Sequence, residues 1–172
     1  MKVIVALDQS ECSDLALQSV LNRKWPEKSQ FKIISVFEPL ATMCVGWEAA
    51  YMPISMIDAE RTLFADRKQY IEKIANDAKA QLAGHDVIGE VLKGYAWNTI
   101  VDIANAWNAD LIVLGSHGKS GLTKFFLGSV AEAVASHAKC SVEIIKGHPL
   151  VDPDVVSAQA KNRATAGTLA KP

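Results

Sequence analysis

The stretch GSHGKSGLTKFFLGS, residues 115–129, decides the fold assignment of this chain. It follows an apolar run typical of a buried strand, residues 110–114, and precedes a spacing of small apolar residues typical of a helix. Glycines at such a junction let backbone N–H groups approach an anion, and the first turn of the helix adds unpaired N–H groups and the positive end of its dipole. The stretch therefore predicts a phosphate-binding loop between a strand and a helix.

The spacing of the glycines excludes two common phosphate loops. A Walker loop needs a glycine five positions before Gly118, and this chain has Val113 there, inside the predicted strand. The pattern G-x-G-x-x-G also fails, because the glycines fall at Gly115, Gly118 and Gly121 and no acidic residue about 20 positions later is placed to hold a ribose. The spacing that remains is G-x2-G-x9-G-[ST].

That spacing is formed by Gly115, Gly118, Gly128 and Ser129. In it the chain resembles the universal stress protein family, specifically the branch that binds ATP. The resemblance extends to the opening strand and turn, residues 2–11, and through residues 94–145. It implies ATP, or ADP or AMP, as ligand, with Mg²⁺ arriving with the triphosphate through water. The nucleotide contacts that the resemblance implies are Ala6, Asp8, Val36, Gly115, Ser116, Gly118, Lys119, Gly128, Ser129 and Val130.

Strand-like and helical patterns alternate through the first 146 residues, which is typical of a mainly parallel sheet covered by helices. The first and fourth predicted strands are almost wholly apolar and are expected at the centre, whereas Gly89 and Glu90 interrupt the third and favour an edge. We predict an α/β fold with a doubly wound five-stranded parallel sheet in the order 3-2-1-4-5 and helices on both faces. The predicted strands are residues 3–7, 31–37, 86–92, 111–114 and 141–145.

In this strand order a crevice opens at the carboxyl ends of the first and fourth strands, because their connections leave in opposite directions. The glycine loop borders one side of the crevice and Asp8 the other. Asp8 has two interpretations, an acid that caps the first helix or, as the resemblance implies, a contact to the nucleoside. His117 either faces phosphate or is simply solvated or hydrogen-bonded, and Ser129 either caps the helix or turns its hydroxyl toward phosphate.

The composition indicates one soluble domain with a tail. The chain has 172 residues, of which 49% are hydrophobic, and a formal net charge of −1, so nothing favours nucleic acid or a membrane as partner. Three widely spaced cysteines predict free thiols. We expect residues 1–147 to form the domain, residues 148–172 to form a flexible tail or a short surface helix, and the protein to be cytoplasmic.

Three functions stay open at this point. The leading one is a module whose adenine nucleotide occupancy alters its stability or its choice of partner. The alternatives are a slow ATPase or autophosphorylating enzyme that uses Ser120 or Thr123, and a protein-interaction module independent of nucleotide. The last strand is expected at an edge, and family resemblance implies a homodimer through it. Residues 38–58 are expected either to pack across the crevice or to cover the core.

Overall fold

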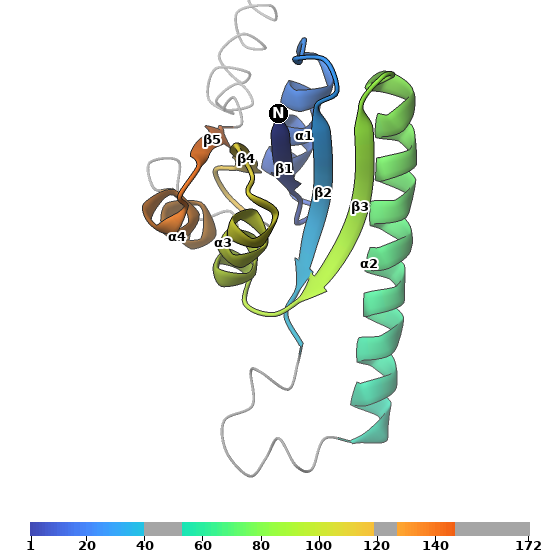
Figure 1. Cartoon of the computed structure of the whole chain (residues 1–172). Coiled ribbons are helices and arrows are strands. Elements are labelled where there is room, and N and C mark those ends of the chain that lie inside the picture. The colour runs from blue at the N-terminus through green and yellow to red at the C-terminus, as the bar shows by residue number, and fades with distance from the viewer. Residues whose placement is uncertain (40–52, 119–126, 147–172) are drawn as a thin grey trace, which may run out of the picture.

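The computed structural model describes residues 1–39, 53–118 and 127–146, and the structural statements below concern these ranges. Five strands form one parallel sheet in the order β3-β2-β1-β4-β5, which confirms the predicted topology (Figure 1). The elements follow the chain as β1 (Lys2–Ala6), α1 (Glu11–Leu21), β2 (Gln30–Phe37), α2 (Ile54–Gln81), β3 (Asp86–Lys93), α3 (Ala96–Trp107), β4 (Leu111–Gly115), α4 (Ser129–His137) and β5 (Ser141–Ile145).

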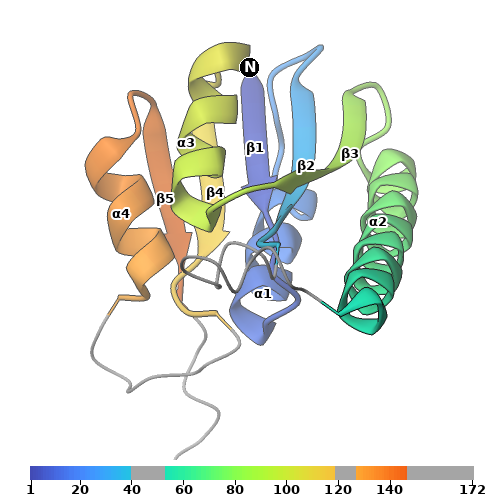
Figure 2. The same ribbon diagram turned by 90° about the horizontal axis from the view of Figure 1, so that it is seen from below.

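Helices cover both faces of the sheet, as predicted. Helices α1 and α2 pack on one face and α3 and α4 on the other (Figure 2). Alternation along each strand explains the two layers, because successive side chains point to opposite faces. In β1, Val3 and Val5 join the core under α1 and α2, whereas Ile4 joins the core under α3 and α4.

Burial matches the predicted positions of the strands in the sheet. Val3, Ile4 and Val5 of the central strand β1 are fully buried. Strand β3 lies at one edge, and its Gly89 has a packing reason: a Cβ there would lie 2.8 Å from the Cβ of Ala75. The glycine therefore lets α2 approach the edge strand closely.

Helix α1 begins with a capping box, which fixes the start of the helix at the carboxyl end of β1. The Ser10 Oγ accepts a hydrogen bond from the Ser13 backbone N–H, and the Ser13 Oγ accepts one from the Ser10 N–H. Gln9, between strand and helix, has a positive φ of 66°. A short turn thus places the first turn of α1 beside the end of β4.

Candidate functional site

Strand register brings the predicted site residues together at the carboxyl ends of the strands. Ala6 of β1 pairs with Leu114 of β4 in parallel register, so the chain segments that follow them leave the sheet side by side (Figure 2). Asp8 follows β1 and residues 116–118 follow β4. The segment at residues 127–130, which starts α4, is tied to the same place because the Gly128 N–H donates to the Ser116 carbonyl at 2.8 Å.

Asp8 faces both the helix start and the glycine loop. Its Oδ1 accepts hydrogen bonds from the Ser10 N–H at 3.0 Å and from the Ser10 Oγ at 2.5 Å. Its Oδ2 lies 2.7 Å from the position that a Cβ would occupy at Gly118. One carboxylate oxygen therefore supports the turn, as the capping interpretation expected, and the other lies against the loop.

The two ends of the loop are held to the sheet and to α1 by backbone atoms. The Ser116 N–H donates to the Ile145 carbonyl at 2.8 Å, which continues the pairing of β4 with β5. The Ser10 Oγ, whose proton goes to the Asp8 carboxylate at 2.5 Å, lies 3.2 Å from the His117 carbonyl. Residues 119–126 lie outside the described ranges, and with them the predicted contact Lys119 and the loop hydroxyls Ser120 and Thr123.

Gly115 has a structural role that the sequence did not reveal. A Cβ at this position would lie 2.7 Å from the carbonyl carbon of Cys12 and 2.8 Å from the Ser13 nitrogen. Both are backbone atoms in the first turn of α1, and they cannot rotate away. The absence of a side chain at Gly115 is therefore required by helix packing, whatever the residue contributes to a ligand.

The start of α4 differs from one of the two predicted arrangements. Gly128 is the N-cap residue of the helix and has no side chain with which to cap the first turn. Ser129 is the first helical residue and is exposed, so the expectation that its hydroxyl caps the helix is wrong. Among the described residues no N-cap side chain thus covers the first turn of α4, whose N–H groups and positive dipole end lie near Ser116.

Ser116 and His117 form a polar pair beneath the loop. Ser116 is 1% exposed, and its Oγ lies 3.0 Å from the His117 Nδ1 and 3.9 Å from the Cys12 Sγ. The other ring nitrogen of His117, Nε2, is buried and has no hydrogen-bond partner among the residues that the structure describes. Cys12 is a free thiol, as predicted, and so is Cys140, whereas Cys44 lies outside the described ranges.

A second polar group beside the crevice was missed by the sequence analysis. The Arg67 Nη1 donates to the Ser35 Oγ at 2.9 Å, and the Ser35 Oγ donates to the Leu7 carbonyl at 2.6 Å. The Tyr70 hydroxyl lies 3.5 Å from the Asp14 Oδ1, and burial followed by the negative charge of Asp14 raises the pKa of Tyr70. The first contact links α2 to β2 and to the residue after β1, and the second links α2 to α1.

The remaining predicted contacts that the structure describes lie at the same end of the sheet. Ala6, Val36 and Val130 are half-buried and pack against the core under α3 and α4. The segment at residues 40–52, which contains most of the predicted crevice cover, lies outside the described ranges. Among described residues there is no cluster of three His, Cys, Asp or Glu side chains that could hold a metal ion.

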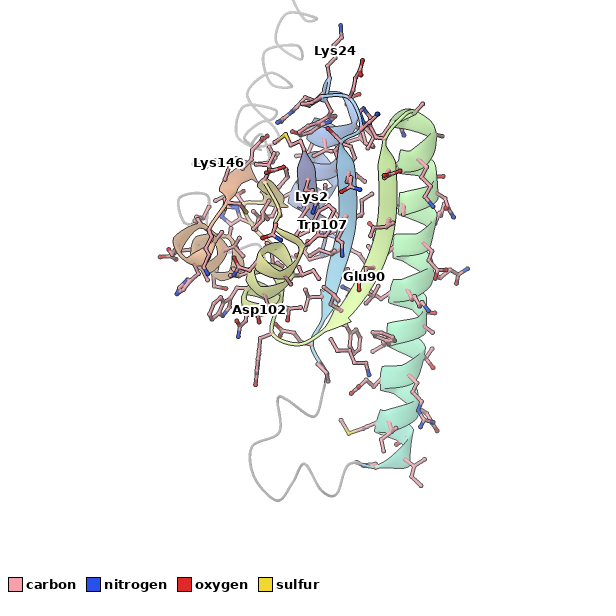
Figure 3. The ribbon with its side chains drawn as sticks, in the orientation of Figure 1. Lys2, Lys24, Glu90, Asp102, Trp107 and Lys146 are labelled. Carbon is pink, nitrogen blue, oxygen red and sulfur yellow. The ribbon has the colours of Figure 1, made fainter. Side chains whose placement is uncertain are left out.

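Two hollows lie away from this crevice. One, of about 430 Å³, lies at the amino ends of β2 and β3 and includes Trp107, whose carbonyl accepts a hydrogen bond from the Lys2 Nζ at 3.1 Å (Figure 3). The other, of about 420 Å³, lies between α1 and the end of β5 and includes Lys146. No helix within the described ranges has the length and apolar character needed to cross a bilayer.

The fold and the loop define an α/β protein of the doubly wound class. The polar residues of the candidate site lie at the ends of β1 and β4, where the strand order reverses. The model of the universal stress protein family matches residues 1–146, and the chain belongs to that family. Universal stress protein MJ0531 of Methanocaldococcus jannaschii is 31% identical over 145 residues, which cover 84% of this chain and 81% of the relative.

Two solved structures share the fold. A universal stress protein in complex with cAMP is 23% identical with a TM-score of 0.53, and the match covers 85% of this chain and 96% of that one. A universal stress protein family protein from Arabidopsis thaliana with AMP bound is 17% identical with a TM-score of 0.56, and covers 89% and 96%. At these identities the likeness concerns the fold.

Proposed function

We propose that this chain binds an adenine nucleotide, ATP in particular, in the crevice at the carboxyl ends of β1 and β4, and that occupancy regulates its stability or its partners. The observation that carries the proposal is that the Asp8 carboxylate faces Gly118 of the loop. The space where Gly118 would have a Cβ is 2.7 Å from the Asp8 Oδ2, so a carboxylate and a bare backbone face each other there.

The residues present fit such a ligand. The uncapped first turn of α4 supplies N–H groups for phosphate, and the Ser129 hydroxyl is exposed beside them. The carboxylate of Asp8 is suited to ribose hydroxyls, which donate hydrogen bonds to it. Val36, near the carboxyl end of β2, has backbone atoms that could contact the base. Mg²⁺ would accompany the triphosphate and keep much of its own water.

Known relatives support an adenine ligand over other phosphates. Two proteins of the same fold have cAMP and AMP bound, as reported above. ATP is the more specific part of the proposal, and it rests on the spacing of Gly115, Gly118 and Gly128.

Calorimetric titration tests this proposal. Protein stripped of nucleotide is titrated with ATP, ADP, AMP and cAMP, with and without Mg²⁺, and the ATP mixture is then analysed for ADP. We expect saturable binding of ATP without product in excess of protein. Gly118→Val should lose most of this binding, because the side chain would displace the Asp8 carboxylate. Gly84→Val is a matched control, since nothing lies within 4 Å of a Cβ there, although its φ of +88° makes some loss of stability expected.

If wild-type protein binds none of these nucleotides, the proposal is wrong. ADP formed in large excess over protein would instead favour the enzyme alternative.

We also propose that two copies associate through β5. This strand is an edge of the sheet, and its residues Val142, Ile144 and Ile145 are only partly buried. Sedimentation equilibrium at micromolar concentration should give twice the 18.6 kDa chain mass. Val142→Lys should shift the mass toward a monomer, because the ammonium group would be buried in the pairing, and a monomeric wild type would contradict the proposal.

A further inference from the structure

We propose that Ser35 and Arg67 are positioning residues for the nucleoside end of the crevice. They act through the Leu7 carbonyl, which they hold away from the strand ladder, so that Asp8 and the Val36 N–H stay available to a ligand. The inference rests on the proposed function, and it assigns a role to two residues that lie outside the glycine loop.

The first step is the point where the pairing of β1 with β2 stops. The register runs to Ala6 opposite Ile34, and the Leu7 N–H donates to the Ile34 carbonyl at 2.8 Å. If the parallel ladder continued, the Leu7 carbonyl would accept a hydrogen bond from the Val36 N–H. Within the described ranges the Leu7 carbonyl accepts one from the Ser35 Oγ instead, at 2.6 Å. A side chain therefore ends the ladder one bond early, at the carboxyl end of β1.

The second step is the direction of the hydrogen bonds. A carbonyl cannot donate, so the single proton of the Ser35 hydroxyl goes to Leu7. The Ser35 oxygen then accepts from the Arg67 Nη1, at 2.9 Å. A guanidinium stays protonated and cannot accept a hydrogen bond. The chain of bonds therefore has one direction, from Arg67 through Ser35 to the Leu7 carbonyl.

The third step is burial, which makes these bonds hard to replace with bonds to water. Ser35 is 1% exposed and Leu7 is 3% exposed. Without the Ser35 hydroxyl, the Leu7 carbonyl would be buried without its donor, and such a group is costly. The backbone donor beside it is the Val36 N–H, and rotation of the peptide between Leu7 and Asp8 toward this donor would continue the ladder. That rotation would move Asp8 and occupy the Val36 N–H.

The fourth step is the connection to the ligand. The Leu7 carbonyl belongs to the peptide that joins Leu7 to Asp8, so its orientation sets the direction in which the Asp8 side chain leaves the strand. In this direction the Asp8 Oδ2 faces Gly118. The N–H groups suited to phosphate belong to another part of the crevice, the start of α4. Disturbing the Leu7 carbonyl should therefore weaken contacts to the nucleoside and leave those to phosphate in place.

Three variants of the full chain test this chain of bonds. Ser35→Ala should weaken binding of both ATP and adenosine by roughly 3- to 10-fold, the effect of one hydrogen bond. Arg67→Met should have a smaller effect of the same kind, because the Ser35 hydroxyl still donates to Leu7. The double variant should bind as Ser35→Ala does, since Arg67 acts through Ser35. Lys68→Met is the matched control, because Lys68 is exposed on the same helix.

Calorimetric titration measures the binding of ATP, and ¹⁵N–¹H spectra measure the binding of adenosine and the exchange of the Val36 amide. We expect Ser35→Ala to lose affinity for both ligands by the same factor. The Val36 amide should exchange more slowly in unliganded Ser35→Ala than in unliganded wild type, because the Leu7 carbonyl now accepts from it. A general loosening of the fold would speed this exchange.

A larger loss for ATP than for adenosine would mean that the phosphate loop had also moved, and it would overturn the inference. Losses that add in the double variant would overturn it too. If wild-type protein binds both ligands and Ser35→Ala binds them equally well, the inference alone fails. If wild-type protein binds neither, the proposed function fails and the inference fails with it.

Discussion

Replacing Gly115 with alanine should destabilise the fold, because the residue separates β4 from the first turn of α1. The new methyl group would lie 2.7 Å from the Cys12 carbonyl carbon and 2.8 Å from the Ser13 nitrogen. These are backbone atoms, so relief requires movement of α1, which the capping box of Ser10 and Ser13 fixes. Overpacking of this kind costs about 1–3 kcal/mol. For a domain of this size it should lower Tm by roughly 3–10 °C.

The assay is urea and thermal unfolding of Gly115→Ala beside Gly118→Ala, without nucleotide. Among the described residues a methyl group at Gly118 meets the carboxylate of Asp8, the end of a flexible side chain, so it should cost less stability but weaken nucleotide binding. The reasoning is refuted if Gly115→Ala unfolds within about 0.5 kcal/mol of wild type, the range of ordinary surface substitutions. In that case the conformational or ligand role of the glycine would matter more than its packing.

Three further predictions concern polar contacts and the third loop glycine. Arg67→Met should lower the free energy of unfolding by about 1 kcal/mol, because it removes a hydrogen bond between α2 and Ser35, whereas Lys68→Met, on the exposed side of the same helix, should be neutral in urea melts. Hydrogen bonding from Arg23 lowers the pKa of Glu143, so this pair stabilises the fold above the unfolded-state pKa and the stabilisation is lost as pH falls through the folded-state pKa. Glu143→Gln should therefore cost under about 1 kcal/mol at pH 7, since the pair is partly exposed, and the difference in urea midpoint should shrink toward pH 3; a constant difference would contradict this. Gly128→Ala places its Cβ 3.0 Å from the Ser116 carbonyl oxygen. In urea melts its loss of stability should therefore lie between those of Gly115→Ala and Gly118→Ala.

The sheet could be predicted because its strands differ strongly in apolar content. The nearly continuous apolar run in β1 belongs at the centre, and Gly89 marks an edge. The predicted strand at residues 3–7 differs from the observed β1, Lys2–Ala6, by one residue at each end. Leu7 still takes part in the sheet, because its N–H donates to the Ile34 carbonyl at 2.8 Å. Element order and strand order thus followed from local patterns alone.

The candidate site could be predicted only in part, because its contacts join residues far apart in the chain. The position of Asp8 opposite the loop followed from strand order, but the packing reason for Gly115 depends on how closely α1 approaches β4. Arg67 reaches Ser35 across 32 positions, and no local pattern marks it. Ser129 had two interpretations, a cap of α4 or a hydroxyl turned toward phosphate, and the structure places Gly128 at the cap position.

Several residues at the crevice contribute both to the fold and to the proposed ligand site, so a bound ligand should stabilise the helix starts that they support. Asp8 supports the start of α1 through Oδ1 and faces the loop through Oδ2, while the Ser10 hydroxyl donates to Asp8 and lies 3.2 Å from the His117 carbonyl. A ligand bound between them would hold the starts of α1 and α4 together. At a ligand concentration of about 100 Kd, binding stabilises the folded state by roughly 2.7 kcal/mol. Nucleotide occupancy should therefore reduce amide exchange most strongly at these two helix starts, and a uniform change across all helices would argue against local coupling through the crevice.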